Sequence, residues 1–122
     1  MSADRRPPAR PTHYTPRGIR RAAAAAAGLN ARQWRQLEQF VDAGCAWLPA
    51  SATVPVGAIN AALGAVDGVQ RLGELGFADG TGNSPEDRWQ ATDAGYELVM
   101  STRGRNATLQ RALAYAGRLD YV

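Results

Sequence analysis

The arginines are the residues whose type and spacing point most directly to a binding chemistry. All 14 Lys/Arg side chains are arginine, and eight of them lie in residues 1–36, where Asp4 is the one acid. Residues 1–36 therefore carry +7, whereas residues 37–122, with six arginines and ten acids, carry −4, and the sum is the net charge of +3. Clustered like charges attract nucleic acids and other polyanions, and guanidinium groups match the geometry of phosphate. A solvated tail that serves solubility is the alternative interpretation.

Other side chains that could do chemistry are few and poorly placed. His13 and Cys45 are the one histidine and the one cysteine, whereas a zinc site needs three or four such ligands. A Ser-His-acid triad would depend on His13, which lies among prolines and would be held poorly as a general base. Glu86 and Asp87 are neighbouring carboxylates in a polar loop, where we expect both to be solvated. We therefore expect no catalytic residues, no metal and no cofactor, and no enzyme.

Cysteine usage and apolar runs bear on the compartment. Cys45 cannot form an intramolecular disulfide, and its apolar surroundings predict a buried thiol in a reducing compartment. The small-residue run after Arg20 and Arg21 ends before Asn30, after eight residues, which is far below the length of a membrane span. We expect a cytoplasmic protein without membrane contact. The excess of alanine, glycine and arginine, with no lysine, indicates a high-GC bacterium or its phage.

Two regions must position these arginines: a basic arm, residues 1–28, and a folded domain, residues 29–122. The arm is rich in proline, arginine and alanine, and we expect it to be partly disordered and partly helical. Thr15 as N-cap and Pro16 at the first helical position predict a helix that ends at Ala27. Three arginines would then share one face of this helix: Arg17, Arg20 and Arg21.

A second helix begins after Asn30, with Gln33 as its capping-box partner. Its apolar residues recur every three or four positions, which predicts an amphipathic core helix. They are Trp34, Leu37, Val41, Cys45 and Leu48, with Phe40 alongside. Residues 49–53 are predicted to form a loop.

Two short helices separated by glycine are predicted next. The first begins near Pro55 and ends at Gly64; the second is capped by Asp67 and ends before Gly76. Two short helices around a glycine turn are typical of a helix-turn-helix unit.

A hairpin and two more helices complete the domain. Extended residues from Phe77 and over 88–92 flank a polar loop, and Thr92 caps the following helix. Residues 103–105 (RGR) are predicted to break that helix, so that a last helix covers 106–121. The inward side chains predicted for the first of the two are Tyr96, Val99 and Met100.

Two stretches resemble a known family. Residues 71–77 read RLGELGF, and after the polar loop residues 89–95 read WQATDAG. In transcriptional regulators of the MarR and PadR kind, a leucine-rich recognition helix ends in glycine and an apolar residue. A β-wing follows, and its second strand enters a helix through Leu-Thr-x-x-Gly. Residues 31–102 therefore resemble a winged helix-turn-helix domain, which implies a mainly α fold with a small β-wing, extended here by the basic arm and an extra C-terminal helix.

The resemblance implies double-stranded DNA as the partner and transcriptional regulation as the function. Gln70 would contact adenine and Arg71 guanine in the major groove, while Asn83 and Arg88 on the wing would meet phosphates or the minor groove. The recognition helix is short, however, and Arg71 shares it with Asp67 and Glu74. The arm would supply the non-specific attraction through Arg5, Arg6, Arg10, Arg17, Arg20 and Arg21.

Two other functions stay open for the same fold. An acidic body of −4 favours a protein-binding adaptor, such as a phage protein that docks on a host factor. A nucleoprotein component that its arm tethers to nucleic acid is the third alternative.

Two packing hypotheses concern apolar residues. The core is predicted to contain Trp34, Leu37, Leu72, Leu75 and Phe77, with Trp89 holding the wing against it. In the last helix an apolar stripe, Leu109, Leu113 and Ala116, either forms a homodimer or folds back onto Trp34 and Phe40.

Overall fold

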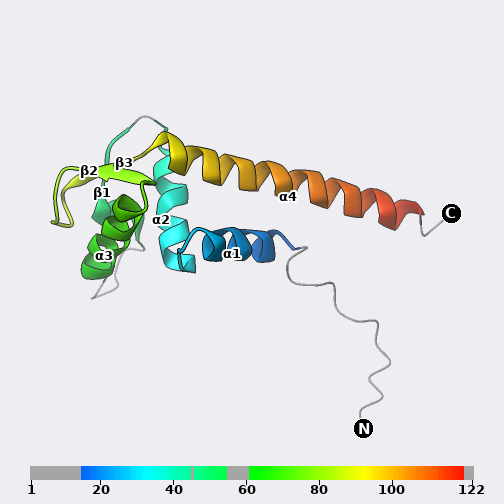
Figure 1. Cartoon of the computed structure of the whole chain (residues 1–122), viewed down its shortest axis with the longest axis horizontal. Helices are drawn as coiled ribbons and strands as arrows, with labels where there is room; N and C mark the ends of the chain where they lie inside the picture. Colours follow the sequence, from blue (N-terminus) through cyan, green and yellow to red (C-terminus); the bar gives the residue numbers. More distant parts are fainter. Residues whose placement is uncertain (1–14, 45, 55–60, 120–122) are drawn as a thin grey trace, which may run out of the picture.

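The computed structural model describes residues 15–44, 46–54 and 61–119, and Figure 1 shows their arrangement. The chain is mainly helical with a small sheet, as the sequence predicted, but the sheet is three-stranded and antiparallel, and its strand at residues 48–49 was not predicted. The elements are α1 (Pro16–Ala26), α2 (Ala31–Asp42), β1 (Leu48–Pro49), the 3-10 helix η2 (Ala50–Thr53), α3 (Ala61–Glu74), β2 (Ala78–Gly80), β3 (Arg88–Ala91) and α4 (Asp93–Leu119).

Helix α2 lies at the centre of the fold, between α1 on one side and α3 with the sheet on the other (Figure 1). Helix α4 begins above the sheet, crosses α2 and continues alongside α1. Its C-terminal part runs on beyond α1, away from the sheet. The molecule therefore has a compact end, made of α2, α3 and the sheet, and an extended end made of α1 and α4.

The predicted starts of α1 and α2 are confirmed. The Thr15 side chain accepts a hydrogen bond from the amide of Gly18 at 3.0 Å, and Pro16 opens the helix. The amide of Gln33 donates to the Asn30 side chain at 2.8 Å, and the Gln33 side chain accepts from the Asn30 amide at 2.9 Å, which completes a capping box. Gly28, at φ +80°, reverses the chain between the two helices, a conformation that glycine adopts without strain.

Helix α2 is shorter than predicted, because it ends at Asp42. Gly44 has a φ of +68° just beyond it, and glycine in this conformation stops a helix. Leu48 is not on the helix but in β1, where it pairs with Trp89 of β3. In place of the predicted loop over 49–53, Pro49 is the last residue of β1 and the remaining residues form η2. The expectation for Cys45 lies outside the described residues.

The predicted break at Gly64 is wrong, since α3 runs without interruption from Ala61 to Glu74. A glycine inside a helix costs about 1 kcal/mol relative to alanine, and here packing outweighs that penalty. Ala65, Val69 and Leu72 are buried on the face turned to the core. The part of the predicted first helix over 55–60 lies outside the described residues, and the described residues 61–74 contain no turn between the two helices predicted here.

The predicted position of the hairpin is confirmed, and the structure adds its register. Strands β2 and β3 pair antiparallel with Ala78 opposite Ala91 and Gly80 opposite Trp89, and β1 adds to the other edge of β3 to give the order β1-β3-β2. Trp89 is 7% exposed, and it lies against both Gly80 and Gly73. The indole therefore joins the hairpin to α3, as predicted.

Helix α4 corrects two predictions. Residues 103–105 do not break it, and the expected start at Asn106 lies inside one helix of 27 residues. Tyr96 and Met100, expected inside, are 51% and 41% exposed, whereas Val99 is fully buried. The predicted N-cap is confirmed, because the Thr92 hydroxyl accepts from the amide of Gly95 at 3.2 Å.

The core lies where α2, α3 and the sheet meet. Trp34, Leu37 and Leu72 are buried as predicted, and Leu75 and Phe77 are partly buried against them. The largest fully buried side chains include one that the sequence did not suggest, Gln36 of α2.

Candidate functional site

The face formed by α3 and the β2–β3 hairpin is where the sequence placed DNA recognition. The Gln70 side chain donates to Asn83 Oδ1 at 3.0 Å, so it joins α3 to the loop between the strands. The loop is itself braced, since the amide of Ser84 donates to Asp87 Oδ2 at 2.8 Å. Two of the predicted contact residues, Gln70 and Asn83, are thereby brought together at the surface.

Arg71 lies differently from its predicted role. Its guanidinium pairs with Glu74 at 3.4 Å, and 44% of the Arg71 side chain is exposed. The same guanidinium lies beside the turn between α1 and α2, where a β carbon added to Gly28 would come within 3.4 Å of it. An exposed pair of this kind contributes little to stability. It does offset the positive charge of Arg71, the one arginine on the described part of α3.

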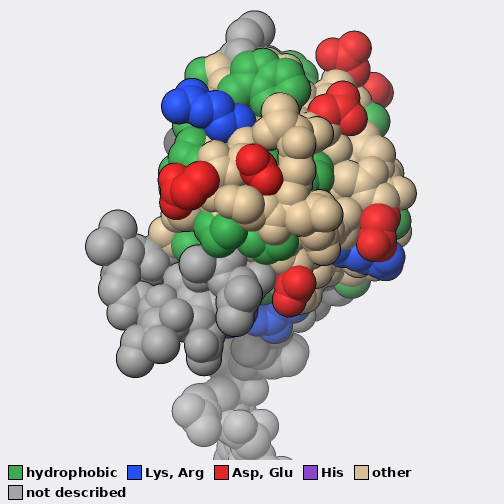
Figure 2. All heavy atoms as spheres, turned by 90° about the vertical axis from the view of Figure 1, so that its left-hand side faces the viewer, with side chains coloured by type: hydrophobic (Ala, Val, Ile, Leu, Met, Phe, Trp, Pro, Cys, Tyr) green, Lys and Arg blue, Asp and Glu red, His purple; other side chains and the backbone are tan. Residues whose placement is uncertain are grey.

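Charge on this face is acidic (Figure 2). The described residues of α3 and the hairpin carry two arginines, Arg71 and Arg88, and a larger number of acids: Asp67, Glu74, Asp79, Glu86 and Asp87. Two positive and five negative charges give −3. Arg88 is exposed on β3. Of the two predicted wing contacts, Asn83 and Arg88, it is the one with a positive charge.

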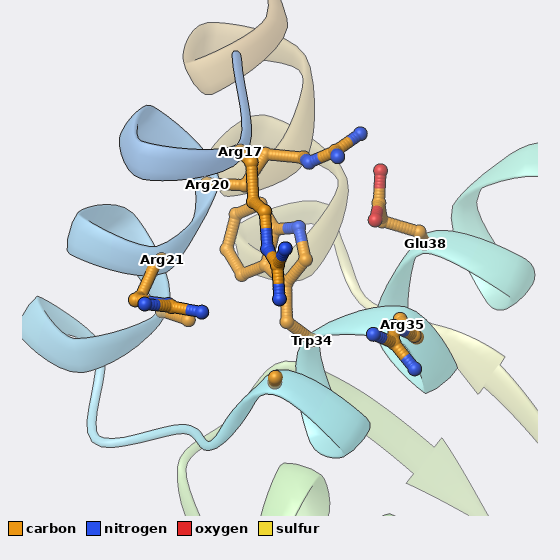
Figure 3. Close-up of a pocket in the computed structure, with 8 residues that line it drawn as sticks. Arg17, Arg20, Arg21, Trp34, Arg35 and Glu38 are labelled. Atoms are coloured by element: carbon orange, nitrogen blue, oxygen red, sulfur yellow. The ribbon is translucent and has the colours of Figure 1, made fainter. Parts of the chain in front are cut away.

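The arginines of the described part of α1 gather on another side of α2, around Trp34 (Figure 3). Arg17, Arg20 and Arg21 share one face of α1, as predicted, and they line a cavity of about 200 Å³ between α1 and α2. Arg35 and Glu38 of α2 complete its charged lining, with Ala24 and Ala31. Arg35 was not predicted, although its position directly after the core residue Trp34 places it at the rim. We call this cavity the arginine pocket. Arg5, Arg6 and Arg10 lie outside the described residues.

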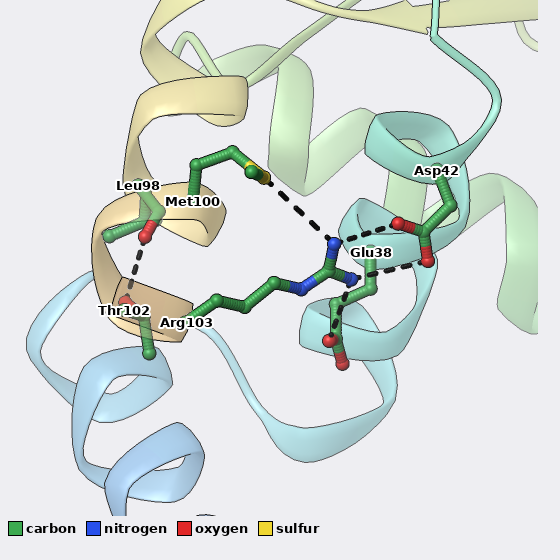
Figure 4. Close-up of polar contacts among 6 residues, drawn as sticks. All are labelled: Glu38, Asp42, Leu98, Met100, Thr102 and Arg103. Carbon is green, nitrogen blue, oxygen red and sulfur yellow. Dashed lines mark hydrogen bonds and ion pairs between the residues drawn. The ribbon is translucent and has the colours of Figure 1, made fainter. Parts of the chain in front are cut away.

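Arg103 holds α4 to α2 beside the arginine pocket (Figure 4). Its guanidinium donates to both carboxylate oxygens of Asp42, at 2.8 and 3.2 Å, and to Glu38 at 3.3 Å. The hydrogen bond to Asp42, with the weaker one to Glu38, raises the pKa of Arg103 against the opposing effect of burial. The sequence, which placed a chain break at this residue, missed this link.

Gln36 positions α2 against α3. Its side-chain amide donates to the carbonyl of Ala65 and to the hydroxyl of Thr53, both at 3.1 Å, and Thr53 in turn donates to the carbonyl of Ala50 at 2.6 Å. Gly68 of α3 lies so close that a β carbon there would overlap the Gln36 side chain. A glutamine on the apolar face of an amphipathic pattern was the signal that could have revealed this contact.

The described residues offer few other functional groups. No cluster of three or more His, Cys, Asp and Glu side chains that could hold a metal ion occurs among them. Within the same residues, no helix combines the length and hydrophobicity needed to cross a membrane. The charged side chains of the described residues form two regions of opposite sign, the acidic face of α3 and the hairpin and the arginine pocket.

Comparison of the chain with protein-family models, with curated proteins and with solved structures gave no match.

Proposed function

We propose that the chain is a winged helix-turn-helix protein that binds double-stranded DNA and acts as a small transcriptional regulator. The observation that carries the proposal is the order of elements at the compact end. A core helix, α2, precedes α3, which leads into a hairpin whose outer edge is completed by the short strand β1. In this proposal α3 is the recognition helix, and residues 81–87 between β2 and β3 are the tip of the wing.

The position of Gln70 supports this assignment. Gln70 lies on the same exposed surface as the wing residue Asn83, to which it is hydrogen-bonded. A glutamine side chain in the major groove can bond adenine through two hydrogen bonds. Recognition of adenine would require the Gln70–Asn83 hydrogen bond to open. In the absence of DNA this bond would keep the Gln70 side chain at the surface of α3.

Electrostatics indicate where affinity would come from. The α3–hairpin face carries −3, so Coulomb attraction to DNA must come from elsewhere, and residues 1–36 carry +7. Each phosphate neutralised by an arginine steepens the dependence of log K on log salt by about 0.9. We therefore expect binding that is weak and strongly salt-dependent, with Arg5, Arg6 and Arg10 among its main contributors.

A protein-binding adaptor is the second candidate, and one observation favours it. Arg71, the arginine that α3 would present to the major groove, is paired with Glu74, on a face with more acids than arginines. Such a face suits a basic protein partner better than a phosphate backbone. A tether to nucleic acid through the arm alone is compatible with the same charges.

A titration of labelled duplex DNA separates these functions. Fluorescence anisotropy at a series of salt concentrations would be measured for the wild type and for a variant with Arg5, Arg6 and Arg10 changed to Gln. We expect this variant to lower the salt slope by about 2 to 3 units. After selection of a preferred sequence, Gln70→Ala should weaken binding to that sequence about tenfold while leaving random duplex unchanged.

Gln39→Ala, a substitution of the same type at an exposed position of α2, is the control and should change neither affinity. Salt-dependent binding without any sequence preference would favour the tether. No DNA binding at low salt would remove regulation from consideration and leave the adaptor.

A further inference from the structure

The arginine pocket concentrates positive charge without neutralising it. Arg17, Arg20 and Arg21 from α1 and Arg35 from α2 all line it. Over the described parts of the chain, none of the four has an ion pair or a side-chain hydrogen bond. Like charges at one site repel one another, so this arrangement gives no stability by itself.

Glu38 is the acid in the lining, but it is already engaged. Its carboxylate accepts from Arg103 at 3.3 Å, on the side where α4 crosses α2. Figure 3 shows Arg17 extended toward Glu38 and Arg35 on the other side of it, with Trp34 between α1 and α2. Since Arg103 also binds the same carboxylate, Glu38 can offset only part of the charge of the four pocket arginines.

Trp34 adds an unused hydrogen-bond donor to the same pocket. The residue is 3% exposed, and its indole Nε1 is buried without a hydrogen-bond partner. In Figure 3 this nitrogen is turned toward the side where Arg17 and Glu38 lie. A buried donor without a partner lowers the stability of a fold, so such groups in a native structure call for an explanation.

We propose that the arginine pocket binds a small phosphate-bearing anion, of the size of inorganic phosphate or pyrophosphate. Guanidinium groups bond phosphate oxygens in pairs with matching geometry. The Trp34 Nε1, which surrounding atoms cover in this structure, would donate to a further oxygen once the exposed arginine side chains turn toward the anion. The volume of about 200 Å³ lies below the range of roughly 300 to 1,000 Å³ typical of drug-sized ligands. The pocket therefore suits one or two phosphate groups rather than a whole nucleotide.

This proposal does not depend on DNA binding. The pocket lies between α1 and α2, whereas α3 and the hairpin lie on the other side of α2 (Figure 1). An anion in the pocket would bridge α1 to α2, and α1 otherwise buries little more than Ala24. Binding should therefore stabilise the docking of α1 whatever the α3 face recognises.

The test uses the indole signals of the intact chain. The three tryptophan Nε1–H resonances are assigned in nitrogen–proton correlation spectra of the wild type and followed as pyrophosphate is added at constant ionic strength. We expect the Trp34 signal to move in a saturable way, because its proton acquires a hydrogen bond. Trp89 is an internal reference, since its Nε1 is also buried without a partner but does not line the pocket.

Matched variants connect the effect to the pocket. Arg35→Gln should weaken binding about tenfold, whereas Arg111→Gln, which removes the same charge from α4, should change it less than about twofold. Arg35→Gln is expected to melt no lower than the wild type without pyrophosphate, since it relieves repulsion, and to gain less from added pyrophosphate. Equal effects of the two variants would overturn the proposal, as would a Trp34 signal that does not move or moves equally with chloride.

A second titration identifies the source of the phosphate. If duplex DNA moves the Trp34 signal and pyrophosphate does not, the arginines contact nucleic acid and the pocket is not a small-anion site. If pyrophosphate moves it in a protein variant or salt range in which DNA does not bind, the site stands even where the proposed function fails.

Discussion

Gly80 lies directly under the indole of Trp89, its cross-strand neighbour in the β2–β3 hairpin. The two residues are paired in register, and a β carbon at Gly80 would overlap the six- and five-membered rings where they join. Because Trp89 also lies against Gly73 of α3, where an added β carbon would come within 3.1 Å of the ring, the indole cannot move aside easily. The hairpin is thus held to α3 by a tryptophan placed between two glycines.

We expect Gly80→Ala to destabilise the fold by about 2 kcal/mol, the range found when atoms are forced into a packed site. Urea unfolding followed by circular dichroism measures the free energy of unfolding. Asp79→Ala, at the exposed neighbouring position of β2, should change it by less than about 0.5 kcal/mol. If the two variants unfold alike, the indole does not lie over Gly80.

Gly104→Ala should have the opposite effect and stabilise the protein by about 0.5 to 1 kcal/mol. Gly104 lies inside α4, and an added β carbon would meet no atom within 4 Å, so alanine brings its higher helix propensity without a clash. Gly76→Ala is the matched control, since it also has open space but a φ of +81°. That substitution should lose about 1 kcal/mol. A loss at both positions in urea unfolding would mean that the chain turns at Gly104.

Gly64 and Gly104 show what the sequence could and could not predict. Local signals that are complete within a few residues were read correctly: the Asn30–Gln33 capping box, the Thr92 cap and the hairpin around Trp89. Gly64 and Gly104 were read as helix ends because glycine has low helix propensity. In the structure both glycines lie inside helices. Whether a helix continues through such a glycine is decided by contacts with residues distant in the sequence, and a local sequence pattern carries no information on these contacts.

The candidate sites follow the same rule. Arg17, Arg20 and Arg21 were placed on one face of one helix from their spacing alone, and they do line one pocket. That the face closes over Trp34 and Arg35 depends on the turn at Gly28, whose direction the spacing does not fix. The pairing of Arg71 with Glu74 was visible as a three-residue spacing of opposite charges, whereas the Gln70–Asn83 bond required the hairpin's position relative to α3.

Arg103→Met should weaken the attachment of α4 to α2. The guanidinium makes three hydrogen bonds to Asp42 and Glu38, but its side chain is 38% exposed, so solvent screening limits the loss to about 1 kcal/mol. Since hydrogen bonding to Asp42 raises the pKa of Arg103, the guanidinium stays charged at every pH at which the fold can be assayed. Because folding raises this pKa, the contribution of the guanidinium is lost as pH rises through the raised value.

Salt dependence checks the origin of the effect. Urea unfolding at low and at high salt should show the loss shrinking as salt rises, and Arg111→Met, at an exposed position of the same helix, should show little loss at either. A loss that is independent of salt would instead assign the stabilisation to the uncharged contact that the Arg103 guanidinium makes with Met100 Sδ at 4.0 Å.

The C-terminal part of α4 presents apolar side chains that α1 does not cover. Leu109 lines a groove of about 380 Å³ together with Ile19, Ala22, Ala23 and Ala26 of α1. Farther along, Ala116 is exposed and Tyr115 is 63% exposed. This part of the helix runs past α1 and away from α2 (Figure 1), so it does not fold back onto Trp34 and Phe40. The homodimer therefore stays a prediction, with Leu113 and Ala116 as its contacts and Leu109 shared with α1.

Light scattering on the wild type and on Leu113→Glu tests this dimer. We expect a dimer at micromolar concentration that Leu113→Glu converts into a monomer with unchanged circular dichroism, because a carboxylate cannot be buried in the interface without several kcal/mol of desolvation penalty. Ala107→Glu introduces the same charge at an exposed position on a different face of α4, and it should leave the dimer intact. A wild type that is monomeric throughout contradicts the prediction. So does a Leu113→Glu variant that loses its helical signal, since Leu113 would then belong to the core of one chain.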